Sequence, residues 1–152
     1  MYIKILHLIQ ITAYIIVASQ LVFYLMVMID ALKKVSIDNF LEQRQAIDSI
    51  FLKRYQPIYY TALLFTLIMV TANVYHELTS GICLQVIALL CLIADITIAR
   101  KKNAPINKLV NTYIPGDQST DWQRVRTQWL QFIRVRGIFI VIGLLALMID
   151  LL

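Results

Sequence analysis

The sequence NAPINKLVNTYIPGDQSTDWQRVRTQWLQFIRVR, residues 103–136, joins one long apolar segment to the next. Its tryptophans begin a series with a spacing of seven: Trp122, Trp129, Arg136, Gly143 and Asp150. On one continuous helix such residues form a single, slowly drifting stripe. A lipid-facing surface would not combine two indoles, a guanidinium, a glycine and a carboxylate. We therefore expect this stripe to face three other helices.

The composition is that of an integral membrane protein. Of 152 residues, 60% are hydrophobic and 15% charged, and the mean hydropathy is +0.73. Soluble domains are about half apolar and a quarter charged. The apolar runs are continuous and not alternating, which favours helices over a barrel. The net charge of +5 comes from residues that flank apolar runs, so we expect no nucleic-acid partner.

The apolar runs predict an all-α up-down bundle of four membrane-spanning helices, over about residues 3–32, 57–76, 82–99 and 132–152. The first run is too long for a signal peptide. An apolar stripe over residues 36–56 predicts an amphipathic helix between spans one and two. The chain is expected to form one domain.

Local signals predict where these helices begin and end. Pro57 suits the first turn of the second span. The basic run of residues 100–102 is expected to close the third span. Thr120, with Gln123 three residues later, fits a capping box that begins the last helix. That helix is expected to continue without a break into the fourth span.

The distribution of Lys and Arg predicts the orientation. Residues 33–56 and 100–131 are rich in both, whereas the link between spans two and three has none. The two basic segments are therefore expected in the cytoplasm and both termini outside it, in the cell's inner membrane. Only Lys4 does not fit this orientation. The oligomeric state stays open, with a homo-oligomer as one option.

Buried charges are expected to pair at the cytoplasmic end of the bundle. Asp95 lies more than a turn inside the third span, and an unpaired carboxylate there costs a few kcal/mol. We expect Asp95 to pair with Arg136 or Arg100, either as a structural clamp or as part of a site. Arg44 and Asp48, four residues apart, fit either an ion pair at the bundle mouth or a snorkelling surface pair.

At the other end lie His7, His76 and Glu77, with Gln85 and Asp150. Two imidazoles and two carboxylates can ligate a metal, but their spacing matches no known motif. We expect no metal site here and no cofactor.

Pro105-Ile106-Asn107 with Asn111, followed by Trp129 and Arg136, resembles the anthrone oxygenase-like family of small four-helix membrane proteins. The resemblance covers the whole layout of the chain. Many members carry a polar residue between the Trp and the Arg, where this chain has Phe132 and Ile133.

The resemblance implies cofactor-independent oxidation of an electron-rich aromatic ketone by a monooxygenase. Asp95 or Asp30 would then act as the base and Arg136 would stabilise the enolate-like anion. The expected substrate-binding residues are Asn107, Asn111, Trp129, Trp122 and Arg100.

The sequence therefore leaves three alternative functions. The first is a membrane-embedded protein that binds, and as an enzyme oxidises, a lipophilic small molecule. The second is a non-catalytic protein whose polar seam binds membrane lipid or a partner helix. The third is a metal or haem protein with its site at the outer face. An enclosed pocket beside Trp129 and Arg136 would favour the first function.

Overall fold

The computed structural model describes residues 2–75, 79–117 and 119–151, and within them every regular element is a helix. Each of two longer helices contains a short π-helical turn. In chain order the elements are α1 (Tyr2–Phe23), η1 (Tyr24–Met28), α2 (Ile29–Lys34), α3 (Ile37–Tyr75), α4 (Thr79–Ile98), η2 (Ala99–Asn103), α5 (Ala104–Val110) and α6 (Trp122–Asp150).

Both π turns continue the helices on either side of them. The backbone N–H of Ile29 donates to the carbonyl of Tyr24, and that of Ala104 to the carbonyl of Ala99. The described residues therefore form four long helices. All four are long and apolar enough to cross a membrane, which fits an integral membrane protein in contact with lipid.

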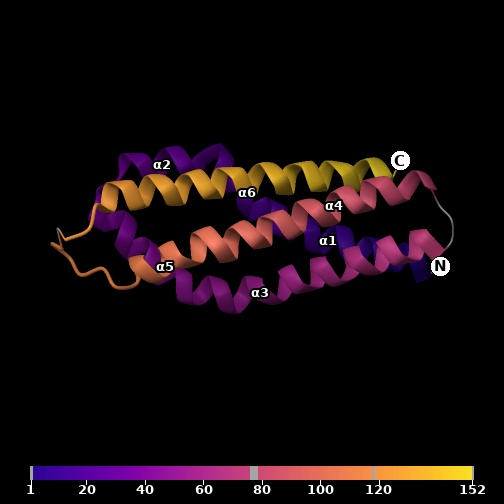
Figure 1. The fold of residues 1–152 in the computed structure, drawn as a ribbon, viewed down its shortest axis with the longest axis horizontal. Helices are drawn as coiled ribbons and strands as arrows, with labels where there is room; N and C mark the ends of the chain where they lie inside the picture. The colour runs from indigo at the N-terminus through magenta and orange to yellow at the C-terminus, as the bar shows by residue number, and fades with distance from the viewer. Residues whose placement is uncertain (1, 76–78, 118, 152) are drawn as a thin grey trace.

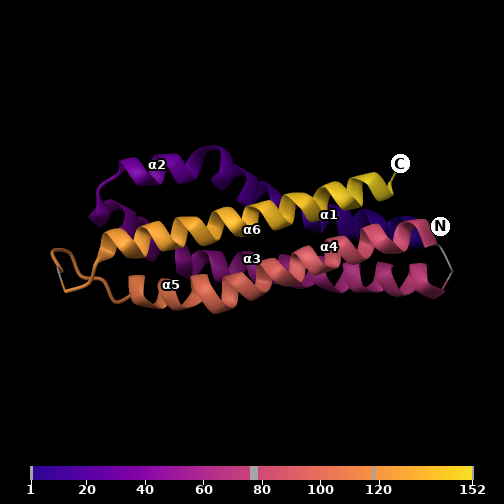
Figure 2. The same ribbon diagram turned by 45° about the horizontal axis from the view of Figure 1, so that its top comes forward.

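The four long helices pack along most of their length. α4 packs on α6, α1 on both α3 and α6, and α3 on α4. Figure 1 shows both termini at one end of the molecule and the link from α5 to α6 at the other. Figure 2 shows the chain bending between α1 and α2, where η1 lies. A π turn is one of the recognised causes of such a bend.

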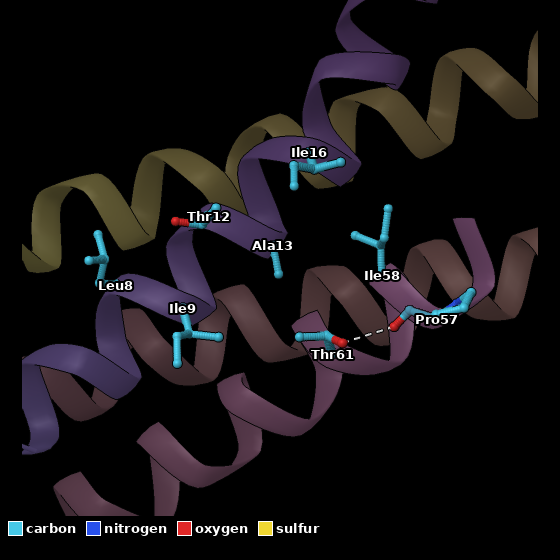
Figure 3. Close-up of a pocket in the computed structure, with 8 residues that line it drawn as sticks. All are labelled: Leu8, Ile9, Thr12, Ala13, Ile16, Pro57, Ile58 and Thr61. Atoms are coloured by element: carbon cyan, nitrogen blue, oxygen red, sulfur yellow. Dashed lines mark hydrogen bonds between the residues drawn. The ribbon is translucent and has the colours of Figure 1, made fainter. Parts of the chain in front are cut away.

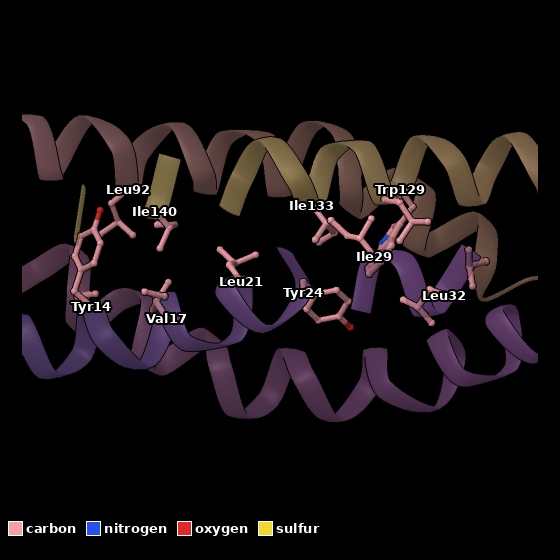
Figure 4. Packing of buried hydrophobic residues seen from close by; sticks show 14 of the residues in the cluster. Tyr14, Val17, Leu21, Tyr24, Ile29, Leu32, Leu92, Trp129, Ile133 and Ile140 are labelled. Atoms are coloured by element: carbon pink, nitrogen blue, oxygen red, sulfur yellow. The ribbon is translucent and has the colours of Figure 1, made fainter. Parts of the chain in front are cut away.

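The buried core comes mainly from α1 and α6, and α2, α3 and α4 contribute fewer residues (Figure 4). Tyr14, which is fully buried, donates a hydrogen bond of 3.1 Å to the carbonyl of Ala88. Gly143 is buried directly against the Tyr14 hydroxyl, and a Cβ at this position would collide with it. The predicted inward stripe is confirmed, since Trp122, Trp129, Arg136 and Gly143 are all buried.

The prediction that Pro57 begins a new helix is wrong, because α3 runs through it from Ile37 to Tyr75. Pro57 lies on an exposed side of the helix. Buried residues before it, Phe40 and Leu41, and after it, Ala62 and Thr66, hold both halves in the bundle. Packing on both sides therefore outweighs the hydrogen bond that proline cannot donate.

Two further boundaries differ from the prediction. The third helix does not end at about Ala99, before the basic residues 100–102, because it continues through η2 and α5 to Val110. The last helix is capped by Asp121, not Thr120: the Asp121 side chain accepts a hydrogen bond of 3.0 Å from the backbone N–H of Arg124. Both residue types cap well, and here the one nearer the first turn does so.

Candidate functional site

A buried ion pair joins α4 to α6. Arg136 Nε donates to Asp95 Oδ1 at 2.7 Å, and the Asp95 side chain is fully buried. Arg136 also donates from Nη2 to the Tyr59 hydroxyl of α3, at 3.1 Å. One guanidinium thus connects three of the long helices. The predicted pairing of Asp95 with Arg136 is confirmed.

A second carboxylate, Asp48, organises the residues around Trp129. Asp48 accepts hydrogen bonds from Asn107 at 2.7 Å and from Asn111 at 3.1 Å. Asn107 in turn accepts a hydrogen bond of 2.9 Å from the Trp129 indole N–H. The Pro105–Asn111 segment is thereby fixed to both α3 and α6.

Arg44 lies flat against this group instead of reaching for the surface. Its guanidinium carbon is 4.3 Å from the centre of the Trp129 ring, and Nη2 is 3.7 Å from Asp48 Oδ1. Only 7% of Arg44 is exposed, and burial lowers the pKa of its guanidinium below the usual value. Tyr24 and Phe40 pack edge-on against Trp129. Of the two interpretations of this pair, the one with a buried ion pair at the bundle mouth is confirmed.

A cavity of about 190 Å³ opens beside these residues, between α3 and the η2–α5 segment. Aromatic side chains form one wall and polar ones the other. The aromatic wall is Phe51, Tyr55, Tyr59 and Tyr60, and the polar wall includes Asp48, Asn103, Asn107 and Arg136. At its edge, Arg100 Nη2 donates to the Tyr60 hydroxyl at 3.2 Å. The cavity therefore suits a molecule with both apolar and polar surface.

Behind it lies a smaller cavity of about 40 Å³, which shares Phe51, Asn103, Asn107 and Arg136 with the larger one. Its other walls are Gln20, Tyr24, Arg44, Trp129 and Ile133. This volume exceeds the ~10–15 Å³ that one water needs. It can therefore hold a water or a small polar group.

Several polar atoms on the walls have no hydrogen-bond partner in the described part of the chain: Gln20 Oε1, Arg44 Nε, and both Oδ1 and Nδ2 of Asn103. Buried polar groups are nearly always hydrogen-bonded, and leaving one unpaired costs about 1–3 kcal/mol. Two donors and two acceptors thus remain to be satisfied at one small cavity. Such a set fits a bound polar group.

Both π turns contribute to this cavity. Tyr24 is the first residue of η1, and Asn103 is the last of η2. Their side chains are buried and line the smaller cavity. Single π turns within α-helices occur often at functional sites. Two of them on separate helices at one cavity therefore mark this region as the candidate site.

The other end of the bundle has a different polar cluster. Gln10 donates to Gln85 at 2.7 Å and to Thr66 at 3.2 Å, and Gln85 donates to Asp150. The His7 Nε2 atom is 3.6 Å from Asp150 Oδ2. These bonds tie the start of α1 to the end of α6.

No metal site is apparent at this end. Within residues 2–75, 79–117 and 119–151, no group of three or more His, Cys, Asp or Glu side chains is placed to hold a metal ion. His76 and Glu77 lie outside the described residues, so the expected absence of a metal stays a prediction.

The predicted site residues fall into three groups. Arg136, Asn107 and Arg100 line the larger cavity, and Arg136, Asn107 and Trp129 line the smaller one. Asp95 and Asn111 support these residues from behind, since neither is among the residues that line the cavities.

Asp30 and Trp122, also predicted for the site, do not line either cavity. Asp30 forms an ion pair of 2.9 Å with Lys33, and 73% of its side chain is exposed. Its place after the apolar run suggested the bundle interior, but it lies on the outward side of α2. Trp122 donates to the carbonyl of Asp117 and packs against Tyr113.

Sequence reasoning missed Tyr24, Gln20, Phe51, Tyr59 and Asn103 as residues of the cavity. Tyr24 and Asn103 belong to the two π turns, which the sequence did not predict. Tyr59 and Phe51 carried a signal, since each lies on an inward stripe of its helix.

Comparisons with protein-family models, with curated proteins and with solved structures find no match for this chain. The resemblance to the anthrone oxygenase-like family therefore rests on its own residues.

The buried ion pair gives a test of what holds the bundle together. Arg136→Ala leaves the Asp95 carboxylate buried without its cation, and we expect a loss of about 3–5 kcal/mol in the free energy of unfolding. The double variant Arg136→Ala with Asp95→Ala should recover much of this loss. Thermal or denaturant unfolding in detergent measures both. Equal losses in the single and double variants would contradict the pairing as the cause.

Proposed function

We propose that this protein binds a lipophilic small molecule within the membrane, with the polar end of the molecule in the small cavity at Asn103. The observation that carries the proposal is the buried Asn103 side chain, whose two amide atoms both lack a partner in the described chain beside a cavity of about 40 Å³. A helix interior has no reason to retain such a residue unless another molecule completes its hydrogen bonds.

The walls indicate the chemistry of this molecule. The unpaired donors and acceptors suit a hydroxyl, carbonyl or carboxylic acid group. Outside the small cavity, the rings of Phe51, Tyr55 and Tyr59 suit a planar or aromatic body. Pockets for small molecules commonly combine mostly apolar walls with a few convergent polar groups.

We further propose that the four helices form an up-down bundle across the inner membrane, with the candidate site at its cytoplasmic end. The first part of α3 would then be the amphipathic helix on the cytoplasmic side, before α3 enters the membrane at about Lys53. The support is the concentration of Lys and Arg at the end opposite the termini.

A second candidate function is oxidation of the bound molecule, as the family resemblance implies. The observation in its favour is a carboxylate on the cavity wall, that of Asp48. An anthrone-type CH₂ group would lose a proton to Asp48, and the resulting anion would sit beside Arg136. Reaction with O₂ would then give a carbonyl and water. Asp95 would act as a positioning residue that holds Arg136, because it does not line the cavity.

The non-catalytic alternative, in which the polar seam binds lipid or a partner helix, predicts no bound small molecule at Asn103. The first test below separates it from the proposal.

We expect the purified protein to carry a lipophile that mass spectrometry of an organic extract detects. Asn103→Leu should lose this molecule without losing stability, because the substitution removes polar atoms that nothing in the described chain satisfies. The matched control for stability is Asn107→Leu, which removes the hydrogen-bond partner of Asp48 and of Trp129. It should lower the free energy of unfolding by about 1–3 kcal/mol. Retention of the lipophile by Asn103→Leu, or an empty wild type, would overturn the proposal.

Oxidation is tested with anthrone and ¹⁸O₂. Wild-type protein should place one ¹⁸O atom in the product, and Asp48→Asn should slow this about 10²–10⁴-fold, the usual contribution of a general base. Asp30→Asn serves as the control, since Asp30 is exposed and paired with Lys33. Product formation at an equal rate in wild type and Asp48→Asn would exclude Asp48 as the base.

The orientation is tested with single cysteines at two exposed positions in a Cys83→Ser background. Lys4→Cys should react with an impermeant thiol reagent from outside the cell, and Ser119→Cys only after the membrane is opened. The reverse pattern would show that the bundle is inverted.

A further inference from the structure

A second cavity, unconnected with the candidate site, lies on the outside of the bundle between α1 and α3. It is an open groove of about 430 Å³ (Figure 3). Leu8, Ile9, Thr12, Ala13 and Ile16 line it from α1, and Pro57, Ile58 and Thr61 from α3. Figure 3 shows Ile16 opposite Ile58, and Ile9 nearer to Thr61. All eight residues belong to helical segments apolar enough to cross a membrane.

The groove exists because small side chains meet there. Ala13 forms part of its floor and is buried, while longer residues such as Leu8 and Ile16 form its edges and are exposed. The Thr61 hydroxyl donates a hydrogen bond of 3.0 Å to the carbonyl of Pro57, so its polar atom is already satisfied. Pro57 has no N–H to offer. The surface thus favours hydrocarbon over water or a polar ligand.

One end of the groove carries positive charge. Arg54 lies three, four and seven residues before Pro57, Ile58 and Thr61, so it shares their face of α3. Arg54 and its neighbour Lys53 are both exposed. The ion pairs of the described chain involve neither of them. Lys53 and Arg54 are therefore cations without an ion-pair partner in the described chain, at the point where the apolar segment of α3 begins.

We propose that this groove binds an anionic phospholipid, with an acyl chain between α1 and α3 and the phosphate at Arg54. The groove runs from Leu8 to Ile16, roughly 12 Å at the rise of an α-helix. That length accommodates part of one acyl chain. A cation near the membrane surface attracts anionic lipid. This attraction corresponds to a preference of about five-fold for an anionic lipid over a neutral one.

The charge pattern favours this occupant over a second copy of the chain. A helix seated in the groove would cover apolar surface, but it would leave Arg54 and Lys53 without a partner unless it also supplied carboxylates at that level. A phospholipid supplies both the hydrocarbon and the negative charge. In a phospholipid the charged headgroup joins the acyl chains at one depth. On α3 the cations Lys53 and Arg54 join the apolar residues in the same way.

The test uses the intact protein in nanodiscs made of equal parts phosphatidylcholine and phosphatidylglycerol. Native mass spectrometry after release counts the lipids of each type that stay bound. We expect the wild type to retain phosphatidylglycerol preferentially, and Arg54→Gln to lower the ratio of phosphatidylglycerol to phosphatidylcholine about five-fold. Lys101→Gln removes an exposed charge away from the groove and should leave this ratio unchanged.

A second pair of variants tests the groove itself. Thr12→Trp fills it and should reduce retention of both lipids. Ile15→Trp places the same side chain on an exposed position of α1 that does not line the groove. This control should not reduce the retention of either lipid. Because all four positions are exposed, each variant is expected to fold, and circular dichroism checks this.

The proposal fails if Arg54→Gln and Lys101→Gln shift the lipid ratio equally, or if Thr12→Trp retains as much lipid as Ile15→Trp. It also fails if Thr12→Trp instead lowers the mass of the assembly, since the groove would then be an interface between copies of the chain. None of these results depends on the cavity at Asn103, so the two proposals stand or fall separately.

Discussion

A guanidinium inside a membrane must be neutralised and hydrogen-bonded by the protein itself, and Arg136 meets this requirement through Asp95 and Tyr59. Because the two partners come from α4 and α3, satisfying one side chain fixes the relative position of three helices. Apolar packing alone would not, since lipid is as good a neighbour for leucine as another helix is. The position of Trp129 and of the cavities beside it follows from where Arg136 is held.

The polar residues at the two ends of the bundle differ in how their hydrogen bonds are satisfied. Near the termini, the side chains of Gln10, Gln85 and Thr66 bond mainly to one another. Near the α5–α6 link, two cavities interrupt the packing, and Asn103 has no partner in the described chain. The first arrangement resembles a structural clasp. Near the termini, Gln10 Oε1 lacks a partner in the described chain, whereas four such atoms of Gln20, Arg44 and Asn103 gather at the small cavity. This concentration supports a binding role for the end near the α5–α6 link.

Much of this fold follows from the sequence because a membrane restricts the options. Long apolar runs can only be helices there, and the spacing of seven from Trp122 to Asp150 defines which side of the last helix turns inward. The partner of Arg136 could be predicted because Asp95 was the carboxylate at similar depth. Each of these inferences needs only residue type and helical period.

The rest of the site depends on information that periodicity does not contain. Asn103 and Tyr24 both belong to π turns and line the cavity, and nothing in the local composition indicates a π turn. Asp30 and Asp48 are both carboxylates near the same end, yet one pairs with Lys33 on the surface and the other bonds Asn107 and Asn111. Only the three-dimensional path of α2 and α3 distinguishes them.

The π turns also affect how this chain tolerates insertions and deletions. Each contains a residue more than an α-helical turn would, and one residue corresponds to about 100° of helix rotation. A deletion within residues 99–103 could restore a regular helix, but Asn107 would then swing away from Trp129 and Asp48. An insertion among the exposed residues 114–116 of the link causes no such rotation. Length is therefore constrained more tightly inside these two helices than between them, and an alignment that places a gap at either π turn would misassign the residues of the cavity.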